Sequence, residues 1–220
     1  MSGMSEPITR LFEAAKQLGV DISNEQATAL LTYIEQMQRW NKTYNLTALK
    51  NIDQMLVQHI FDSLSVVLPL RQKLAGKNAV NVLDVGSGGG LPGVVLAIMN
   101  PTWNVCCVDA VEKKTAFVRQ MSGVLKLSNL SSQHIRIEKR TEPAVDLVIS
   151  RAFASLADFA SLAGQHVNES GYLGAMKGHY IQEEVNELEL KTEWEVVSHE
   201  TLSVPELDAN RCLIWLQRKG

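Results

Sequence analysis

A glycine-rich stretch near the middle of the chain constrains the fold more than any other feature. It reads VLDVGSGGGLPG, from Val82 to Gly93, and places five glycines directly after an apolar run and an acid. Glycine adopts left-handed turns readily and lets a backbone approach a ligand closely. In doubly wound sheets such a turn follows the first strand and faces a ligand. The stretch therefore raises one question: whether it holds a dinucleotide, a nucleotide phosphate, S-adenosylmethionine or no ligand.

The chain after Gly76 alternates between short apolar runs and helical patterns. We expect strands and helices in turn, at 79–85, 91–99, 104–110, 112–127, 132–138, 144–151, 152–166, 171–178 and 180–191. Two further apolar runs, EWEVVSHE and CLIWLQRK, follow with no helix between them. Alternating strands and helices predict a parallel sheet covered on both faces, here of about seven strands. One of the last two strands is expected to be antiparallel, at the end of the sheet.

The first part of the chain is expected to be all-helical. A short amphipathic helix is predicted at 6–18, a second helix begins after Ser23, and a third spans 52–70. The second carries the capping-box pattern Ser23 to Gln26. Its apolar positions share one helical face: Ala27, Leu30, Leu31, Ile34 and Met37. We therefore expect a helical cap at 1–75 and an α/β domain at 76–220, joined as one compact unit.

Composition narrows the class of protein. The 220 residues are 45% hydrophobic and 20% charged, which is enough apolar material for one sizeable core. No apolar run approaches the roughly 20 residues of a membrane span, and no signal-peptide pattern is visible. The three cysteines, two of them adjacent at Cys106 and Cys107, indicate neither a disulfide framework nor a metal site. We expect a cytoplasmic monomer without membrane contact.

Net charge gives nucleic-acid binding no support, because 21 Lys and Arg face 24 Asp and Glu for a total of −3. A local basic rim is still predicted beside the sheet, from Lys113, Lys114, Arg119, Arg136, Lys139 and Arg140. RWNKTYNLT also interleaves basic and aromatic residues, which suits base stacking. The alternative is that Trp40 and Tyr44 dock the helical cap onto the sheet.

The glycines alone fit two ligands. Gly86, Gly88 and Gly90 form G-x-G-x-G, while Gly88, Gly90 and Gly93 form the dinucleotide pattern in a shifted register. Asp84 favours S-adenosylmethionine, because an acid suits its sulfonium and ammonium groups better than a pyrophosphate. Asp109, at the end of the second strand, suits the ribose hydroxyls of either ligand. A phosphate-binding P-loop is excluded, since no Gly-Lys-Ser/Thr follows.

The residues after the fourth strand bear on the methyl acceptor. They read Ser150-Arg151-Ala152-Phe153, without the Pro-Pro-aromatic loop of adenine amino-methylation. Cytosine carbon methylation needs a thiolate, yet Cys106 and Cys107 lie inside an expected strand. The site thus suits an acceptor with a ready lone pair. Guanine N7 fits, because it needs no deprotonation before attack.

The sequence resembles the bacterial small-subunit ribosomal RNA guanine-N7 methyltransferase family, known as RsmG or GidB. The matching stretches span nearly the whole chain: WNKTYNLTAL, HIFDSL, LDVGSGGGLPG, ISRAFASL, AMKG and VPELDANRCL. The resemblance implies a class I, Rossmann-like methyltransferase fold with a helical N-terminal extension. It implies S-adenosylmethionine as donor and a guanine of 16S ribosomal RNA, within the small ribosomal subunit, as acceptor.

The resemblance also implies site residues. Gly86, Gly88 and Leu91 fall on the cofactor loop, and Arg151 falls on the arginine of Ser-Arg-Ala-Phe-Ala, which contributes to the same pocket. Ile137 and Glu138, after Arg136 at the end of the third strand, fall on the segment around the adenine. No catalytic residue is assigned; Arg151 is expected to orient the guanine or the cofactor. No metal ligand is assigned.

Two departures from the family pattern concern contacts around the site. Gln58 stands where the family often has arginine before His59, which removes one phosphate contact. Glu112 replaces a glycine in the loop after Asp109. His59 and Asp62, one turn apart on an expected helix, are assigned either a substrate role or a structural network.

Three alternative functions remain at this point. The first is a methyltransferase for a small molecule, which would use the same loop on another acceptor. The second is an NAD-dependent oxidoreductase, which the shifted glycine pattern allows. The third is a factor that binds S-adenosylmethionine or the ribosome without turnover.

Overall fold

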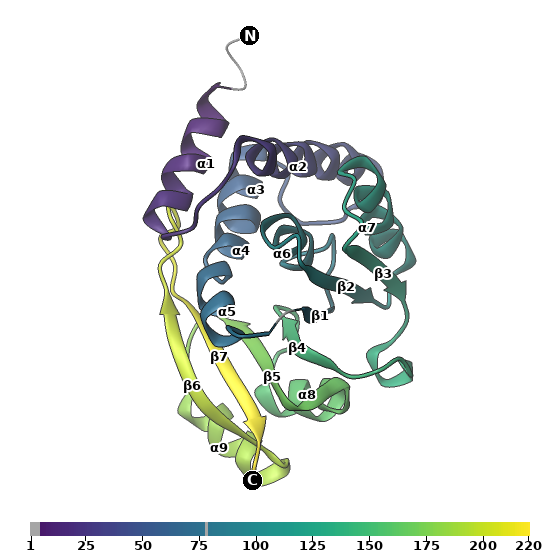
Figure 1. Cartoon of the computed structure of the whole chain (residues 1–220), viewed down its shortest axis with the longest axis vertical. Coiled ribbons are helices and arrows are strands. Elements are labelled where there is room, and N and C mark those ends of the chain that lie inside the picture. Colours follow the sequence, from purple (N-terminus) through teal and green to yellow (C-terminus); the bar gives the residue numbers. More distant parts are fainter. Residues whose placement is uncertain (1–4, 78) are drawn as a thin grey trace.

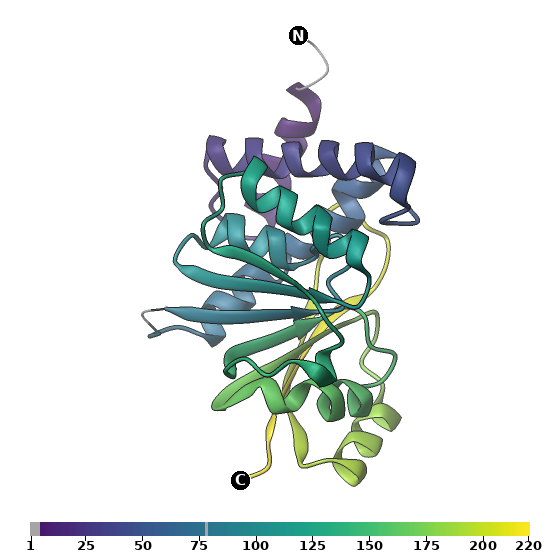
Figure 2. The same cartoon turned by 90° about the vertical axis from the view of Figure 1, so that its right-hand side faces the viewer.

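In the computed structural model, which describes residues 5–77 and 79–220, one seven-stranded sheet runs through the molecule (Figures 1 and 2). Its spatial order is β3-β2-β1-β4-β5-β7-β6. The strands are β1 (Val80–Val85), β2 (Trp103–Asp109), β3 (Leu130–His134), β4 (Val145–Ser150), β5 (Val167–Lys177), β6 (Trp194–Leu202) and β7 (Arg211–Arg218). β1 to β5 pair in parallel, which confirms the expected doubly wound α/β fold.

The antiparallel strand lies one position in from the edge of the sheet. β7 pairs antiparallel with both β5 and β6, so β6 forms the edge. The antiparallel strand was expected at the end of the sheet, and this position is wrong, because β7 is second from the edge. The short connection at 203–210 explains the pairing, because only an antiparallel hairpin can be closed by so few residues.

β3 is shorter than the sequence indicated. It ends at His134, and residues Ile137–Lys139 form a 3-10 turn, η2, where strand was expected up to 138. The last pair between β2 and β3 joins Asp109 to His134. Because β3 is an edge strand, it has no other neighbour to extend along beyond the end of β2. Ile137 and Glu138 therefore lie past the strand and not at its end.

Helices cover both faces of the sheet. α6 (Gly93–Met99) and α7 (Glu112–Val124) pack on one face with the N-terminal helices, while α8 (Leu156–Ala163), η3 (Gly164–His166) and α9 (Gln182–Lys191) lie toward the other. Figure 2 shows these layers with the sheet between them. Each face has its own cluster of buried apolar side chains. The first cluster is shared between α6, α7 and the N-terminal segment.

The N-terminal segment is helical, as expected. Its elements are α1 (Ser5–Gln17), α2 (Asn24–Tyr44), α3 (Ile52–Met55), η1 (Leu56–Phe61), α4 (Asp62–Leu64) and α5 (Val67–Lys73). The capping box of α2 is confirmed: the Ser23 hydroxyl accepts from the Gln26 N–H, and the Gln26 side chain accepts from the Ser23 N–H. The five apolar positions predicted to face the core are buried.

The third helix is not the single element predicted for 52–70. A π-helical stretch, η1, occupies Leu56–Phe61, and the path breaks after α4 before α5 begins at Val67. At the break the Ser65 hydroxyl donates to the Asp62 carbonyl, 2.6 Å away. Apolar periodicity cannot reveal such a stretch, because it changes which backbone groups pair while the residues remain helical. π-helical turns occur frequently at functional sites.

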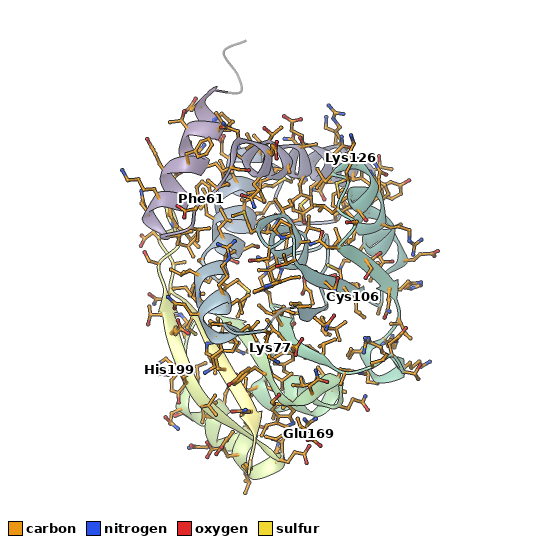
Figure 3. The ribbon with its side chains drawn as sticks, viewed as in Figure 1. Phe61, Lys77, Cys106, Lys126, Glu169 and His199 are labelled. Atoms are coloured by element: carbon orange, nitrogen blue, oxygen red, sulfur yellow. The ribbon has the colours of Figure 1, made fainter. Side chains whose placement is uncertain are left out.

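The N-terminal segment packs directly onto the sheet domain. Phe61, fully buried, lies among the N-terminal helices in Figure 3. Arg10 of α1 pairs with Asp53 of α3 and with Glu206 of the β6–β7 loop, 2.8 Å and 2.7 Å apart. The division into a cap and a second domain stays a prediction. Within the described residues, no helix combines the length and hydrophobicity needed to cross a membrane.

Candidate active site

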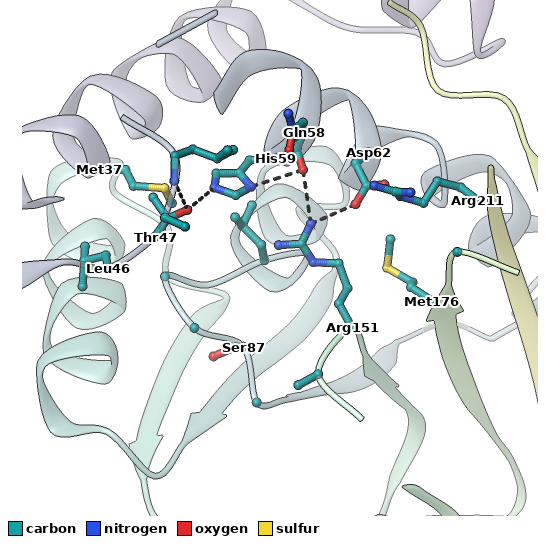
Figure 4. Close-up of a pocket in the computed structure, with 18 of the residues that line it drawn as sticks. Met37, Leu46, Thr47, Gln58, His59, Asp62, Ser87, Arg151, Met176 and Arg211 are labelled. Carbon is teal, nitrogen blue, oxygen red and sulfur yellow. Dashed lines mark hydrogen bonds and ion pairs between the residues drawn. The ribbon is translucent and has the colours of Figure 1, made fainter. Parts of the chain in front are cut away.

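A cavity of about 540 Å³ opens at the carboxyl ends of the parallel strands. Its walls come from four places: the glycine loop after β1, the turn after β4, the ends of β5 and β7 that meet there, and the N-terminal helices. Figure 4 shows its charged residues close together. Ligands in doubly wound sheets bind at this edge, beside the point where the strand order reverses. The cavity is therefore the candidate active site.

The glycine loop forms the floor of the cavity. Gly86, Gly88 and Gly90 have φ values of 66°, 59° and 96°, in the region that favours glycine. A Cβ on Gly86 would lie 2.6 Å from the Cβ of Ala152, so the turn after β4 presses on the loop. A Cβ on Gly88 would meet nothing within 4 Å. This open, backbone-lined cradle fits a bound nucleoside cofactor.

Asp109 holds the glycine loop from the side of the sheet. Its Oδ2 accepts from the Gly88 N–H and its Oδ1 from the Val111 N–H, both at 2.9 Å. Lys114 Nζ lies 3.6 Å from Oδ2. Asp109 is buried and is not among the residues that line the cavity. Its expected ribose contact stays a prediction, since each carboxylate oxygen has a further lone pair.

Asp84 lies beneath the loop and not in the cavity. Its side chain is fully buried, with Oδ2 accepting from the Gly93 N–H at 2.7 Å and Oδ1 without a hydrogen-bond partner. Burial raises the pKa of Asp84 to about 7, although the Gly93 hydrogen bond opposes that rise. The role considered for this acid, beside a sulfonium, does not fit this position. Asp84 instead connects β1 to the first turn of α6.

The chain between α2 and α3 forms one wall and is held by two side chains. Asn41 donates to the Leu49 carbonyl and accepts from the Thr47 N–H. Thr47 Oγ1 lies 2.9 Å from His59 Nε2, and His59 Nδ1 lies 3.2 Å from the Gln58 carbonyl. Burial, and after it the charge of Arg151, lower the pKa of His59 to about 4. His59 is therefore neutral near pH 7, and each of its ring nitrogens forms a hydrogen bond with another group of the protein.

Asp62 is the charged centre of the opposite wall. Its side chain is only 4% exposed, yet it pairs with two arginines. Oδ2 lies 2.8 Å from Arg151 Nη1, and Oδ1 lies 2.9 Å from Arg211 Nε. Lys177, at the end of β5, donates to the Ala154 carbonyl and pairs with Glu184. Three distant stretches of chain thus bring their charges to one rim.

The structure brings together some of the predicted site residues and separates others. Gly86, Gly88, Leu91 and Arg151 line the cavity. Asp109, Ile137 and Glu138 do not: Ile137 is buried and Glu138 is exposed on η2. Their roles around a ribose and an adenine stay predictions. His59 and Asp62 both line the cavity. Each also contacts another side chain of the protein, His59 that of Thr47 and Asp62 that of Arg151.

Sequence reasoning missed the contributions of β5 and β7. Met176, Lys177 and Arg211 line the cavity, although AMKG and NRCL were recognised only as matching stretches. Their positions at the ends of two strands expected in the same sheet were the available signal. Of the predicted basic rim, Arg140 is buried and donates to backbone carbonyls, so it does not belong to a surface. Trp40 packs on Phe117, which favours the docking interpretation, while Tyr44 is 43% exposed.

Comparisons with known proteins identify the family. A model of the GidB family, rRNA small subunit methyltransferase G, matches residues 26–214. The Ribosomal RNA small subunit methyltransferase G of Bordetella petrii is 58% identical over 99% of this chain and 85% of that protein. The protein of the same name from Bordetella pertussis is 59% identical over 96% of this chain and 94% of its own length.

Solved structures agree on the fold. A SAM-dependent methyltransferase from Aquifex aeolicus superposes with a TM-score of 0.57 at 18% identity, covering 74% of this chain and 92% of that one. Another, from Thiobacillus denitrificans in complex with S-adenosyl-L-homocysteine, gives a TM-score of 0.51 at 12% identity, covering 70% and 90%. The family match and the relatives confirm the expected methyltransferase class, and the solved structures agree with the expected fold. The oxidoreductase alternative is not favoured. The chain belongs to the GidB family of rRNA small subunit methyltransferases.

Proposed function

We propose that this enzyme transfers the methyl group of S-adenosylmethionine to N7 of one guanine in 16S ribosomal RNA. The substrate class rests on the names of its relatives, which are ribosomal RNA small subunit methyltransferases. We propose that it acts as a monomer in the cytoplasm, on the assembled or assembling small subunit. The choice of N7 as the acceptor atom rests on the side chains that line the cavity.

The state of the ionisable groups around the cavity carries the choice of N7. Among the described residues that line it, the titratable side chains are His59, Asp62, Arg151, Lys177 and Arg211. Asp62 is paired with two arginines, and both nitrogens of His59 are engaged. Neither group is left to remove a proton from the acceptor. Guanine N7 needs no such base, because its lone pair is exposed on the base edge.

The residues proposed to hold the donor lie around the glycine loop. Gly86 and Gly88 offer backbone at an open surface, Leu91 offers an apolar contact, and Asp109 fixes the loop from behind. Glu138 and Ile137 are proposed to lie beside the adenine. S-adenosylmethionine, when bound, supplies a methyl group on a sulfonium that any well-placed lone pair can take.

The residues proposed to hold the acceptor lie on the cap side. Leu46, Leu49 and Met176 give apolar walls suited to the faces of a planar base. Arg151 and Arg211, fixed by Asp62, give N–H groups suited to polar edges. A base must leave its stack to enter such a cavity. Holding it in line with the donor is then the main contribution of the protein to the rate.

The basic rim is proposed to track the RNA backbone. Its exposed or half-buried members lie on or beside α7 and η2: Lys113, Lys114, Arg119, Arg136 and Lys139. Positive side chains on one edge can neutralise phosphates even when the total charge is negative. Binding of this kind weakens as salt is added, so salt dependence is its signature.

Methyl-labelled S-adenosylmethionine tests the substrate class. We expect label to pass to small ribosomal subunits from cells that lack this methylation, and to become soluble after ribonuclease treatment. A labelled product that resists ribonuclease would instead indicate a small-molecule or protein acceptor. Donor binding without any transfer would support the non-catalytic alternative and contradict the proposal.

A further inference from the structure

A residue of the N-terminal helices contacts the glycine loop from the side away from the sheet. Tyr33, in the middle of α2, donates its hydroxyl to the Gly89 carbonyl at 2.7 Å. Both residues are buried, so this hydrogen bond is shielded from water. An unpaired carbonyl at such a place costs free energy, which makes the bond a constraint on the loop.

The packing around Tyr33 leaves it little freedom. Its ring stacks on Phe117 of α7, with centroids 6.0 Å apart and planes at 25°. A Cβ on Gly90 would lie 3.5 Å from the Tyr33 hydroxyl, and a Cβ on Gly89 would lie 3.0 Å from Cε of Met37. Burial also raises the pKa of Tyr33 well above its ordinary value, so the hydroxyl keeps the proton that it donates.

The glycine loop that Tyr33 contacts also lines the cavity. Gly86, Gly88 and Gly89 all line it. The loop is therefore held at two neighbouring points: Asp109 accepts from the Gly88 N–H, and Tyr33 donates to the Gly89 carbonyl. One anchor comes from the end of β2 and the other from the helical cap. Together they fix the orientation of the backbone that the open cradle presents.

We propose that Tyr33 is a positioning residue for donor binding, through which the helical cap sets the conformation of the glycine loop. The proposal rests on the donor site assigned above. It gives the cap a role in the donor half of the active site, in addition to the walls that it contributes at 46–49. It also accounts for a polar hydroxyl in the buried core, where phenylalanine would otherwise serve.

Tyr33→Phe tests the proposal, because it removes one oxygen and keeps the ring. We expect S-adenosylhomocysteine, measured by titration calorimetry, to bind about threefold to tenfold more weakly, as loss of one orienting hydrogen bond predicts. The KM for the donor should rise by the same factor, while kcat at saturating donor stays within about twofold. A tyrosine that only stabilised the fold would lower the Tm and leave this affinity unchanged.

Tyr172→Phe is the matched control. Its ring packs edge-on against Trp215, on β5 and away from the loop. The Tyr172→Phe variant should bind S-adenosylhomocysteine with the same affinity as the unaltered chain. Unchanged affinity in Tyr33→Phe would overturn the proposal, whereas failure of the unaltered chain to bind would overturn the donor site itself.

Hydrogen exchange gives a second readout that needs no ligand. In Tyr33→Phe, amides at 86–91 should exchange faster than in the unaltered chain, with β4 and β5 unchanged. Equal exchange at 86–91 in the two proteins would also contradict the proposal. Exchange that rises throughout the sheet would show general loosening and would count against a local role.

Discussion

The Oδ2 atom of Asp62, in the helical N-terminal segment, lies 2.8 Å from Nη1 of Arg151, at the carboxyl end of β4. The same carboxylate reaches Arg211 through its other oxygen. One buried acid thus joins the cap, the turn after β4 and the start of β7 at the rim of the cavity. The positions of both arginines depend on a residue far from them in sequence.

Asp62→Asn should disorder both arginines. The variant keeps the size of the side chain but loses the charge, and one amide oxygen replaces the two carboxylate oxygens that accept from the two guanidiniums. We expect the unfolding free energy to fall by about 1–3 kcal/mol. We expect kcat for methyl transfer to fall at least about tenfold. Urea unfolding and labelled transfer to small subunits measure the two effects.

Asp53→Asn is the control for Asp62. Asp53 also pairs with an arginine at 2.8 Å, but its side chain is 62% exposed. Exposed pairs contribute little, so both quantities should stay close to those of the unaltered chain. Equal effects in the two variants would show that the position of Asp62 at the cavity has no special importance.

Gly88→Ala should act on the donor more than on the fold. At a φ of 59° an alanine costs about 1 kcal/mol, and its methyl group would project into the open cradle. We expect affinity for S-adenosylhomocysteine to fall at least about tenfold, while the protein stays folded at room temperature. Gly123→Ala, in α7, meets nothing within 4 Å and should bind the ligand normally. Normal binding by Gly88→Ala would show that the cradle is not part of the donor site.

Asp109 has two separable effects. Asp109→Ala removes acceptors from Gly88 and Val111, so we expect about 1–3 kcal/mol lower stability and weaker donor binding. The ribose contact is tested by comparing S-adenosylhomocysteine with its 2′-deoxy analogue on both proteins. If Asp109 contacts that hydroxyl, the analogue loses affinity on the unaltered chain and much less on the variant. Equal losses on both would contradict the ribose assignment.

Asp84 should make stability depend on pH. Its folded pKa is about 7, above the ordinary value of 3.8, because the carboxyl is buried. The folded chain therefore binds more protons than the unfolded chain between these values, and this contribution to stability falls as the pH rises through that window. Relative to Asp84→Asn, the unaltered chain should lose about 3 kcal/mol of unfolding free energy between about pH 5 and pH 8.

The control for Asp84 is Asp158→Asn, an exposed carboxyl on α8. Its stability should follow that of the unaltered chain across the same pH range. Parallel pH curves for the unaltered chain and Asp84→Asn would show that Asp84 is ionised in the folded protein at both ends of the range.

Local patterns in the sequence predicted the elements that local chemistry determines. The capping box at Ser23 and the apolar face of α2 depend on residues three and four apart, and both are present as expected. The alternation after Gly76 predicted the parallel sheet, because each strand carries a continuous apolar run. The end of β3 was misplaced, since it depends on where its only neighbour stops.

The candidate site was only partly predictable for the same reason. The glycine loop is contiguous, and its residues could be named from the sequence alone. Asp62, Arg151 and Arg211 meet only after the cap folds onto the sheet, and 149 residues separate the first from the last. The π-helical turn that carries His59 leaves no trace in the apolar pattern. Tyr33 was not among the positions predicted for the apolar face of α2, and its hydrogen bond to the Gly89 carbonyl forms only when the cap packs on the loop.

The position of the transferred methyl group tests the central claim most directly. Small subunits from cells lacking the activity would be incubated with the protein and methyl-labelled S-adenosylmethionine, and the RNA then cleaved chemically at N7-methylated guanines. We predict a single cleavage site in 16S ribosomal RNA. The amount of RNA cleaved there should equal the amount of label incorporated. Label that resists this cleavage, or that lies on another atom or another RNA, would contradict the assignment of guanine N7.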